Sequence, residues 1–182
     1  MDTETPVFLE GDRADIVPLE QRHQELLYRL WNDPSVWKHD FGIPPHPLGP
    51  DAVESEYDSM TSPEPVTGVV RVDGDPAGVT AITDFDKVSR TAELGVSLAS
   101  GHRGRQVGTE VATLMTTFGF RQLDLHKLVY KAIACNEAAT ECIEGLGATR
   151  EGVHRDEQYV DGERHDVYYY GLLASEWEPE SV

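Results

Sequence analysis

The sequence predicts an α/β protein in which helices pack against one central sheet. Three observations lead to this class. About seven short runs rich in β-branched and apolar residues alternate with helical patterns along the chain. One run, Ala92–Leu98, leads through a glycine-containing loop into a long amphipathic pattern, which indicates a strand followed by a helix. Another run, Leu128–Ala134, is almost continuously apolar, as strands buried on both faces usually are.

The first half of the chain combines an extended segment, two helices and two strands. We expect Asn32-Asp33-Pro34 to end the first helix, because a residue before proline avoids helical dihedrals. The prolines of Trp37–Pro50 predict a loop, where Trp31 and Trp37 either line a ligand pocket or belong to the core. The elements expected here are the extended segment Val7–Leu19 with a turn at Gly11-Asp12, helices over Gln21–Trp31 and Asp51–Met60, and strands over Glu64–Val72 and Ala77–Phe85.

The second half alternates strands with two further helices. The helix after the glycine loop has an apolar stripe, including Val111, Met115 and Phe118, that should face the sheet. In Tyr168-Tyr169-Tyr170 the middle residue should face away from its neighbours, and these side chains contribute to the core or to a homodimer contact. The remaining elements expected are a helix opened by Asn136 that includes inward-facing Ala138, continues to Glu144 and is ended by Gly145 and Gly147, and strands over Ala148–Val153 and His165–Leu173.

Length and composition restrict the class of protein further. A chain of 182 residues with 39% hydrophobic residues is large enough for one domain, which we expect to cover residues 1–182. No apolar run approaches the ~20 residues that span a bilayer, and the N-terminus lacks the regions of a signal peptide. Cys135 and Cys142 are a poor basis for a disulfide, and the seven histidines show no metal-ligand spacing. We therefore expect a cytoplasmic protein without a membrane anchor or a bound metal.

The charge of the chain is unusual. Acidic residues number 33 against 15 basic ones, which gives a formal net charge of -18. Because the acids are spread along the chain, we expect a carboxylate-coated surface like that of proteins from salt-loving organisms. The alternative is a domain that attracts basic partners such as polyamines or basic protein tails. Either interpretation argues against nucleic-acid binding through a basic face.

The loop after Ala92–Leu98 has the features of an anion site. The first amides of a helix lack intrahelical partners, and the helix dipole places partial positive charge there. Arg103 and Arg105 add full positive charges within a strongly acidic chain. The loop therefore predicts a phosphate-bearing ligand. The alternative is that the two arginines are merely solvated.

This unit resembles the central motif of the GNAT superfamily of N-acetyltransferases, which is Arg or Gln, two residues, Gly, one residue, and Gly or Ala. The chain has Arg103-Gly104-Arg105-Gln106-Val107-Gly108, so Gln106 replaces the first motif glycine. Because backbone amides bind the phosphates in this motif, we expect the site to survive if Gln106 holds a negative φ.

Other stretches resemble the RimJ/RimL-type branch of that superfamily, and together they cover nearly the whole chain. The resemblance implies a GNAT fold, with a central mixed, mostly antiparallel sheet of about seven strands flanked by helices. The stretches are Leu30-Trp31-Asn32-Asp33-Pro34, Ala92-Glu93-Leu94-Gly95, Asn136, Gly145-Leu146-Gly147 with Glu151-Gly152, and Asp161-Gly162 with Asp166 and Tyr170.

The resemblance also implies a binding site for acetyl-CoA as co-substrate. The pantetheine would pair with the backbone of Val96, Ser97 and Leu98, next to the loop residues Arg103 and Gly104. The pyrophosphate would lie over the amides of Arg105, Gln106, Val107, Gly108 and Thr109. Asn136 stands where the family uses an asparagine side chain against the cofactor, although Asn also fills the N-cap position of a helix well.

The chemistry implied is attack of a primary amine on the thioester in a ternary complex. The acceptor would be a protein N-terminus or a small amine. A free amine has a pKa of ~10, so a carboxylate that accepts its proton would help. Glu93 is the leading candidate because it lies on the strand that carries the thioester. The alternative is a structural carboxylate that ties neighbouring elements together.

No general acid can be assigned from the sequence. Some relatives protonate the leaving thiolate with a Ser or a Tyr at positions that are Ala139 and Ile143 here. Water can serve instead, since a thiolate is a tolerable leaving group. These gaps keep open a second class of function, a non-catalytic acyl-CoA-binding sensor or partner subunit. The sequence nevertheless favours an acetyl-CoA-dependent N-acetyltransferase.

Overall fold

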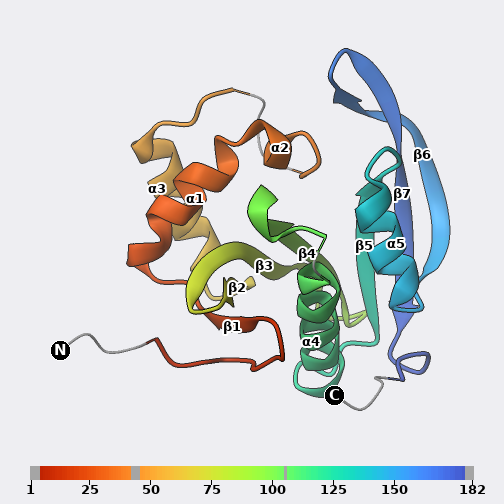
Figure 1. Cartoon of the computed structure of the whole chain (residues 1–182). Helices are drawn as coiled ribbons and strands as arrows, with labels where there is room; N and C mark the ends of the chain where they lie inside the picture. Colours follow the sequence, from red (N-terminus) through yellow and green to blue (C-terminus); the bar gives the residue numbers. More distant parts are fainter. Residues whose placement is uncertain (1–4, 42–45, 105, 179–182) are drawn as a thin grey trace. The chain divides into compact units, whose positions relative to one another are not determined.

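The structure is a computed structural model that describes residues 5–41, 46–104 and 106–178 (Figure 1). Seven strands among these residues form one sheet in the order β1-β2-β3-β4-β5-β7-β6. Strand β5 runs parallel to β4 and antiparallel to β7, so the sheet is mixed. The expected α/β class and the seven-stranded mixed sheet with flanking helices are confirmed.

Two compact units divide the chain. The first unit comprises Met1–Ala81 and Val96–Val111, and the second comprises Ile82–Gly95 and Ala112–Val182. Strands β3 and β4 and helix α4 each continue from one unit into the other. The elements that begin in the first unit are β1 (Asp15–Pro18), η1 (Gln21–His23), α1 (Gln24–Trp31), α2 (Pro34–Trp37), α3 (Pro50–Met60), β2 (Val66–Val72), β3 (Asp75–Asp86), η2 (Ser100–His102) and α4 (Val107–Arg121).

The first unit follows the expected order, with one additional helix. Helix α1 ends at Trp31 with Asn32 as its C-cap, and Asp33 is the N-cap of α2. The Asp33 side chain accepts a hydrogen bond from the Ser35 N–H at 2.8 Å, and Pro34 takes the first helical position. The expected loop is therefore shorter than Trp37–Pro50, since Trp37 belongs to α2 and Pro50 opens α3. Residues 42–45 of that loop lie outside the described residues.

The core of the first unit lies between helices α1 to α3 and strands β1 to β3. Trp31 is 7% exposed and belongs to this core, which confirms the core alternative for this side chain. Asn32 attaches the proline-rich loop to α1, because its side-chain amide exchanges two hydrogen bonds with the backbone of Leu48. The buried residues of this core are Val17, Leu26, Leu27, Leu30, Trp31, Val36, Leu48, Val53, Val69 and Val79.

The second unit contains the beginning of β4 (Thr91–Leu98), most of α4, and then β5 (Lys127–Ile133), α5 (Glu137–Gly145), β6 (Thr149–Val160) and β7 (Glu163–Leu173). Helix α5 lies along β5 and β7 (Figure 1). The hairpin of β6 and β7 is longer than expected, because its polar residues continue pairing up to the turn at Asp161-Gly162. Both turn residues have positive φ, 51° and 92°, as tight hairpin turns require.

Two burial expectations in the second unit are wrong. Strand β5 is not buried on both faces, because Leu128, Tyr130 and Ala132 are buried whereas Val129 and Lys131 between them are partly exposed. In α5 the expected inward-facing Ala138 is exposed, while Ile143 is buried. One face of β5 is buried, and the other carries the partly exposed side chains of Lys127, Val129 and Lys131.

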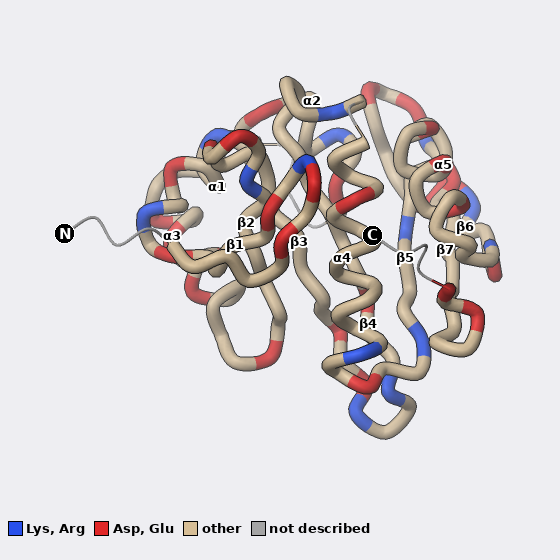
Figure 2. Tube along the Cα trace, turned by 60° about the horizontal axis from the view of Figure 1, so that its bottom comes forward, with Lys and Arg blue, Asp and Glu red and all other residues tan. Residues whose placement is uncertain are grey.

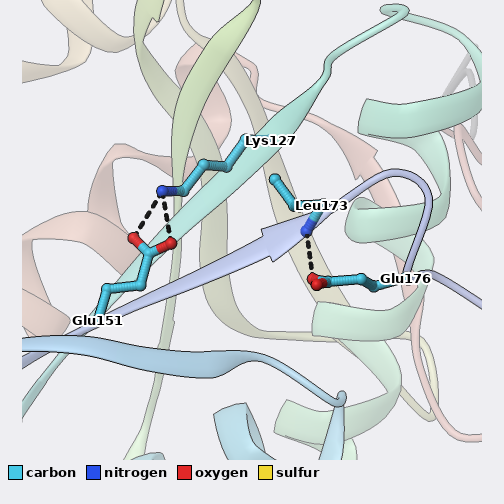
Figure 3. Close-up of polar contacts among 4 residues, drawn as sticks. All are labelled: Lys127, Glu151, Leu173 and Glu176. Carbon is cyan, nitrogen blue, oxygen red and sulfur yellow. Dashed lines mark hydrogen bonds and ion pairs between the residues drawn. The ribbon is translucent and has the colours of Figure 1, made fainter.

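An ion pair crosses three strands at one end of the second unit (Figure 3). Lys127 on β5 contacts both carboxylate oxygens of Glu151 on β6, at 2.7 and 2.5 Å. Gly171 on the intervening strand β7 makes this possible, because a Cβ there would lie 2.5 Å from both Glu151 Oε1 and Lys127 Cε. After β7, Glu176 accepts a hydrogen bond from the N–H of Leu173 at 3.0 Å.

Acidic residues are distributed along the trace rather than gathered in one segment (Figure 2). Cys135 is exposed, Cys142 is partly buried, and both are free thiols. Within the described ranges, no helix is long and apolar enough to cross a membrane.

Candidate active site

The glycine loop joins β4 to α4 within the first unit. Gly104 has a φ of 73°, which glycine adopts without strain. Gln106 has a φ of 61°, so the negative φ that was the condition for an intact site is not adopted, and Gln106 instead takes a left-handed conformation that the motif glycine would adopt freely. The carbonyl oxygen of Gln106 accepts the first helical hydrogen bond, from Glu110 at 3.0 Å. The turn into the helix thus requires a left-handed residue, and Gln replaces the motif glycine at a cost of about 1 kcal/mol.

The first turn of α4 is where the predicted phosphate would bind. The N–H groups of Val107 and Gly108 precede the first hydrogen bond of the helix, so they have no partner within it. A Cβ on Gly108 would meet one protein atom within 4 Å, Leu98 Cδ1 at 3.7 Å, so the protein itself does not need glycine there. A ligand that approaches the backbone closely at this position would require a glycine there. Thr109 is exposed in the same turn, and Arg105 lies outside the described residues.

Arg103 is exposed, and its guanidinium is hydrogen-bonded to backbone atoms of the first unit. Its Nε donates to the carbonyl oxygen of Leu98 at 2.9 Å, and its Nη1 donates to that of Ser35 at 2.8 Å. These bonds tie the loop to the end of β4 and to α2. They fix the position of the guanidinium, and a phosphate contact by Arg103 stays a prediction.

The end of β4 is closely packed against β3. Ala99 donates a backbone hydrogen bond to Ala77 at 2.9 Å, and a Cβ on Gly78 would collide with Ser97 O and Leu98 Cδ2. The pairing of β4 with β5 covers only its first three residues, Thr91–Glu93. In the described ladder, Val96, Ser97 and Leu98 are therefore outside the pairing with β5.

Asp40 is a partly buried carboxylate that the sequence pattern does not single out. It follows α2, and its carboxylate lies near the Ser97 side chain and the backbone N–H of Phe41, both of which lower its pKa as hydrogen-bond donors. Burial raises the pKa of Asp40 above its ordinary value, while these hydrogen bonds and the charge of Arg103 oppose the rise. The one available signal was an acid between aromatic residues in the proline-rich segment. It did not indicate Ser97 as the partner.

Glu93 forms an ion pair within the second unit. Its Oε2 lies 2.5 Å from Nζ of Lys131 on the neighbouring strand β5, and the two side chains are 23% and 27% exposed. Burial alone would lower the pKa of Lys131, but the hydrogen bond and the charge of Glu93 raise it above its ordinary value. This geometry supports the alternative that Glu93 ties neighbouring strands together. Its role as a base stays a prediction.

A polar cluster continues from this pair across β7 and β6. The Lys131 ammonium lies 5.4 Å from the ring centre of Tyr169, whose hydroxyl donates to Glu157 at 3.0 Å. His154 stacks on Tyr169 with ring centres 4.0 Å apart, and it contacts Glu157 at 3.0 Å. Tyr169 thus faces away from Tyr170, which is buried and donates to Glu144 on α5. The expected alternation of the three tyrosines is confirmed.

Asn136 is the N-cap of α5, where its side chain accepts a hydrogen bond from the Ala139 N–H at 3.3 Å. The capping alternative is confirmed, and a cofactor contact by the same residue stays a prediction. Ile143 is buried and cannot donate a proton. Burial and the bond to Glu144 raise the pKa of Tyr170 to about 12, so its hydroxyl stays protonated in the core. The part of the chain that the structure describes holds no group of His, Cys, Asp or Glu arranged for a metal ion.

Residues 13–149 match the sequence profile of the acetyltransferase (GNAT) domain, and this range includes the glycine loop, β4 and Asn136. The Bacillus subtilis protein YdaF, whose name assigns it provisionally to ribosomal N-acetyltransferases, is 35% identical over 108 residues. That alignment spans 59% of this chain and 59% of YdaF.

Two further similarities extend over most of the chain. Spermidine N(1)-acetyltransferase of Escherichia coli is 27% identical over 168 residues, which cover 89% of each protein. The solved structure of RimL, a ribosomal L7/L12 α-N-protein acetyltransferase in complex with coenzyme A, superimposes with a TM-score of 0.83. The superposition covers 94% of this chain and 99% of RimL. Because the sequence identity is 15%, this similarity supports the fold alone.

Proposed function

The chain belongs to the acetyltransferase (GNAT) family, and from this premise we propose that it transfers the acetyl group of acetyl-CoA to a primary amine. The observation that carries the proposal is the loop–helix unit within the matched residues. There, the N–H groups of Val107 and Gly108 face no helical partner, and no side chain at Gly108 blocks an approach. An acetyl thioester is already activated, so positioning of the amine supplies much of the rate.

Three parts of the chain would contact acetyl-CoA. The amides at the start of α4 would hold the pyrophosphate, and the backbone of Val96, Ser97 and Leu98 would hold the pantetheine arm. Asn136 would add a side-chain contact. Because the thioester reacts directly with the amine in a ternary complex, no protein nucleophile is required.

The acceptor we propose is a cationic primary amine, either a small polyamine or a protein N-terminus. Similarity to spermidine N(1)-acetyltransferase over 89% of both chains supports the polyamine. The partial similarity to YdaF supports a ribosomal protein N-terminus and the RimJ/RimL-type branch. The net charge of -18 favours a cationic acceptor in either case, because it attracts positive ligands over long range.

A screen for coenzyme A release tests this proposal. The protein would be incubated with acetyl-CoA and, separately, with spermidine, with peptides bearing a free N-terminus, and with the same peptides N-terminally acetylated. Turnover with spermidine alone assigns the polyamine, and turnover with free peptides that is lost on acetylation assigns the N-terminus. Release at background level with every amine would contradict the transferase proposal.

The cofactor site is tested separately by calorimetry with acetyl-CoA. Gly108→Val should weaken binding by about 2 kcal/mol or more, because the backbone can no longer close on its ligand. Gly101→Val in the same loop is the control, since an added Cβ there meets nothing within 4 Å. Equal affinities of the two variants would rule out this phosphate site.

A second candidate is a non-catalytic acyl-CoA sensor or partner subunit. Ala139 and Ile143 favour it, because neither side chain can protonate a leaving thiolate. Binding of acetyl-CoA without turnover would be its signature. We also propose that the protein works in a high-salt cytoplasm. We propose that it contacts neither nucleic acid nor membranes and that it forms a homodimer.

A further inference from the structure

A cavity of about 440 Å³ lies in the first unit, where it is lined in part by strands β1 and β2. Its volume is within the ~300–1,000 Å³ that is typical of sites for small molecules. Val17 and Val69, which are buried in the core of this unit, provide apolar lining, and Gly74 and Pro76 line it from the connection between β2 and β3. Its described lining residues all belong to the first unit and lie outside the glycine loop.

An ion pair between β1 and β2 forms part of the polar lining. The two strands lie side by side (Figure 1), and their register places Asp15 opposite Arg71 and Val17 opposite Val69. Because alternate residues of a strand share a face, the charged pair and the valine pair lie on the same face of the sheet. Arg71 Nη2 donates to Asp15 Oδ2 at 2.9 Å, and the two side chains are 17% and 29% exposed. This contact fixes the guanidinium beside the cavity.

Arg71 has a second donor that the fold does not use. Its Nε atom is buried and has no hydrogen-bond partner among the described residues. Such a donor is unfavourable, because it has lost contact with water without gaining another acceptor. A guanidinium presents its N–H groups as a planar fork that matches a carboxylate, and Asp15 occupies one position of this fork. An acceptor atom of a ligand could occupy the position at Nε.

His23 and Thr5 add further donors to the lining. His23 Nδ1 accepts a hydrogen bond from the N–H of Glu20 at 3.0 Å. Burial and then the charge of Arg22 lower the pKa of His23, so its ring is neutral at pH 7 and carries its proton on Nε2. The ring therefore has a donor left for a ligand and no acceptor. Thr5, which is 9% exposed, contributes a hydroxyl group.

The two arginines that line the cavity are each in an ion pair. Arg71 contacts Asp15, and Arg22 contacts Glu20 at 2.9 Å. A cationic ligand would therefore have to displace Arg71 from the carboxylate of Asp15. An anionic ligand can accept a hydrogen bond from Arg71 Nε without breaking either pair. The unused donors thus favour an anion, and the apolar lining favours one with a carbon skeleton.

We infer that this cavity is a binding site for a small organic carboxylate. The carboxylate accepts hydrogen bonds from Arg71 Nε and from the donors of His23 and Thr5, while its carbon atoms contact Val17 and Val69. The site is separate from the residues proposed to bind acetyl-CoA, so it does not rest on the proposed function. A bound carboxylate stabilises the protein, because a ligand that binds only the folded state shifts the folding equilibrium toward it.

The test measures calorimetric binding and the melting temperature with acetate, succinate and citrate, at a constant ionic strength set with KCl. Succinamide, in which uncharged amides replace both carboxylates of succinate, is the control ligand. We expect saturable binding and a raised melting temperature with at least one carboxylate, and neither effect with succinamide. The site would be overturned if none of the three carboxylates bound saturably, if succinamide bound as well as succinate, or if the diamine putrescine bound in their place.

Two variants locate the binding to this cavity. Arg71→Lys keeps the charge that pairs with Asp15 but removes the Nε donor, so we expect it to bind the carboxylate about ten-fold more weakly. Arg90→Lys makes the same exchange at an exposed ion pair in the second unit and should leave the affinity unchanged. Thr5→Val keeps the shape of the side chain without its hydroxyl and should also weaken binding. An unchanged affinity in Arg71→Lys would overturn the site. If that variant does not fold, an unchanged affinity in Thr5→Val would do so.

Discussion

Gly78 on β3 lies directly against the backbone of Ser97 on β4, and no side chain fits between them. A Cβ on Gly78 would collide with Ser97 O, and it would lie 2.7 Å from Leu98 Cδ2 and 3.0 Å from Leu98 Cα. Two of these obstacles are backbone atoms, which cannot rotate away. The position of Val96–Leu98, the segment proposed to hold the pantetheine, thus depends on a glycine on the neighbouring strand.

Gly78→Ala should therefore displace the end of β4. We expect the free energy of unfolding to fall by about 2 kcal/mol, as for an overpacked core, and acetyl-CoA binding to weaken as well. Urea unfolding and calorimetry measure the two effects. Gly152→Ala on β6 is the control, because an added Cβ there meets nothing within 4 Å. If Gly78→Ala bound acetyl-CoA normally, the proposed pantetheine segment would be wrong.

Gln106→Gly should stabilise the protein. Gln106 has a φ of 61°, which costs a residue with a side chain about 1 kcal/mol and glycine almost nothing. We expect the free energy of unfolding to rise by about 0.5–1 kcal/mol with acetyl-CoA affinity retained. Gln106→Ala keeps the left-handed penalty and should show no gain. A gain in the alanine variant equal to that in the glycine variant would exclude backbone strain as the cause.

Patterns that are local in the sequence predicted the fold well. The Ala92–Leu98 strand, the glycine loop and the following helix were each indicated by neighbouring residues, and the Asp-Pro pair marked the end of α1. The conformation of Gln106 was not indicated by its neighbours. A glutamine in place of glycine suggests a negative φ, whereas the turn into α4 requires a positive one.

The side-chain partners in the site could not be predicted in the same way. Arg103 and Ser35 are far apart along the chain, and the hydrogen bond between them forms only in the folded unit. The pair of Glu93 and Lys131 depends on the register of two parallel strands, in which Glu93 lies opposite Val129. Hydrophobic periodicity predicts which face a residue occupies, but it does not fix this register.

Glu93→Gln distinguishes a structural carboxylate from a base. If the pair with Lys131 is structural, the variant should lose about 0.5–1 kcal/mol of stability, with kcat changed less than a few-fold. The raised pKa of Lys131 means that this contribution is present below pH ~10 and is lost as the pH rises through the folded value. A fall of ~10²-fold in kcat that shrinks at high pH would instead identify Glu93 as the base.

The acidic composition predicts stabilisation by salt. With 33 acidic residues and four lysines, repulsion between carboxylates should destabilise the folded state until counter-ions screen it. We expect the melting temperature to rise by many degrees between 0.1 and 2 M KCl. A flat or falling curve would contradict adaptation to high salt and favour a basic partner as the reason for the charge.

The raised pKa of Asp40 predicts how stability depends on pH. Between the unfolded value of about 3.9 and the higher folded value, the folded state binds more protons than the unfolded chain. The free energy of unfolding should therefore decrease as the pH rises through this window, since ionised Asp40 is partly desolvated. Asp40→Asn lacks this titration, so the variant should gain stability relative to the wild type as the pH rises above about 4, and the difference should level off once Asp40 is fully ionised. Denaturant unfolding at a series of pH values measures the difference. A difference that does not vary with pH would show that the pKa of Asp40 is the same in the folded and unfolded states.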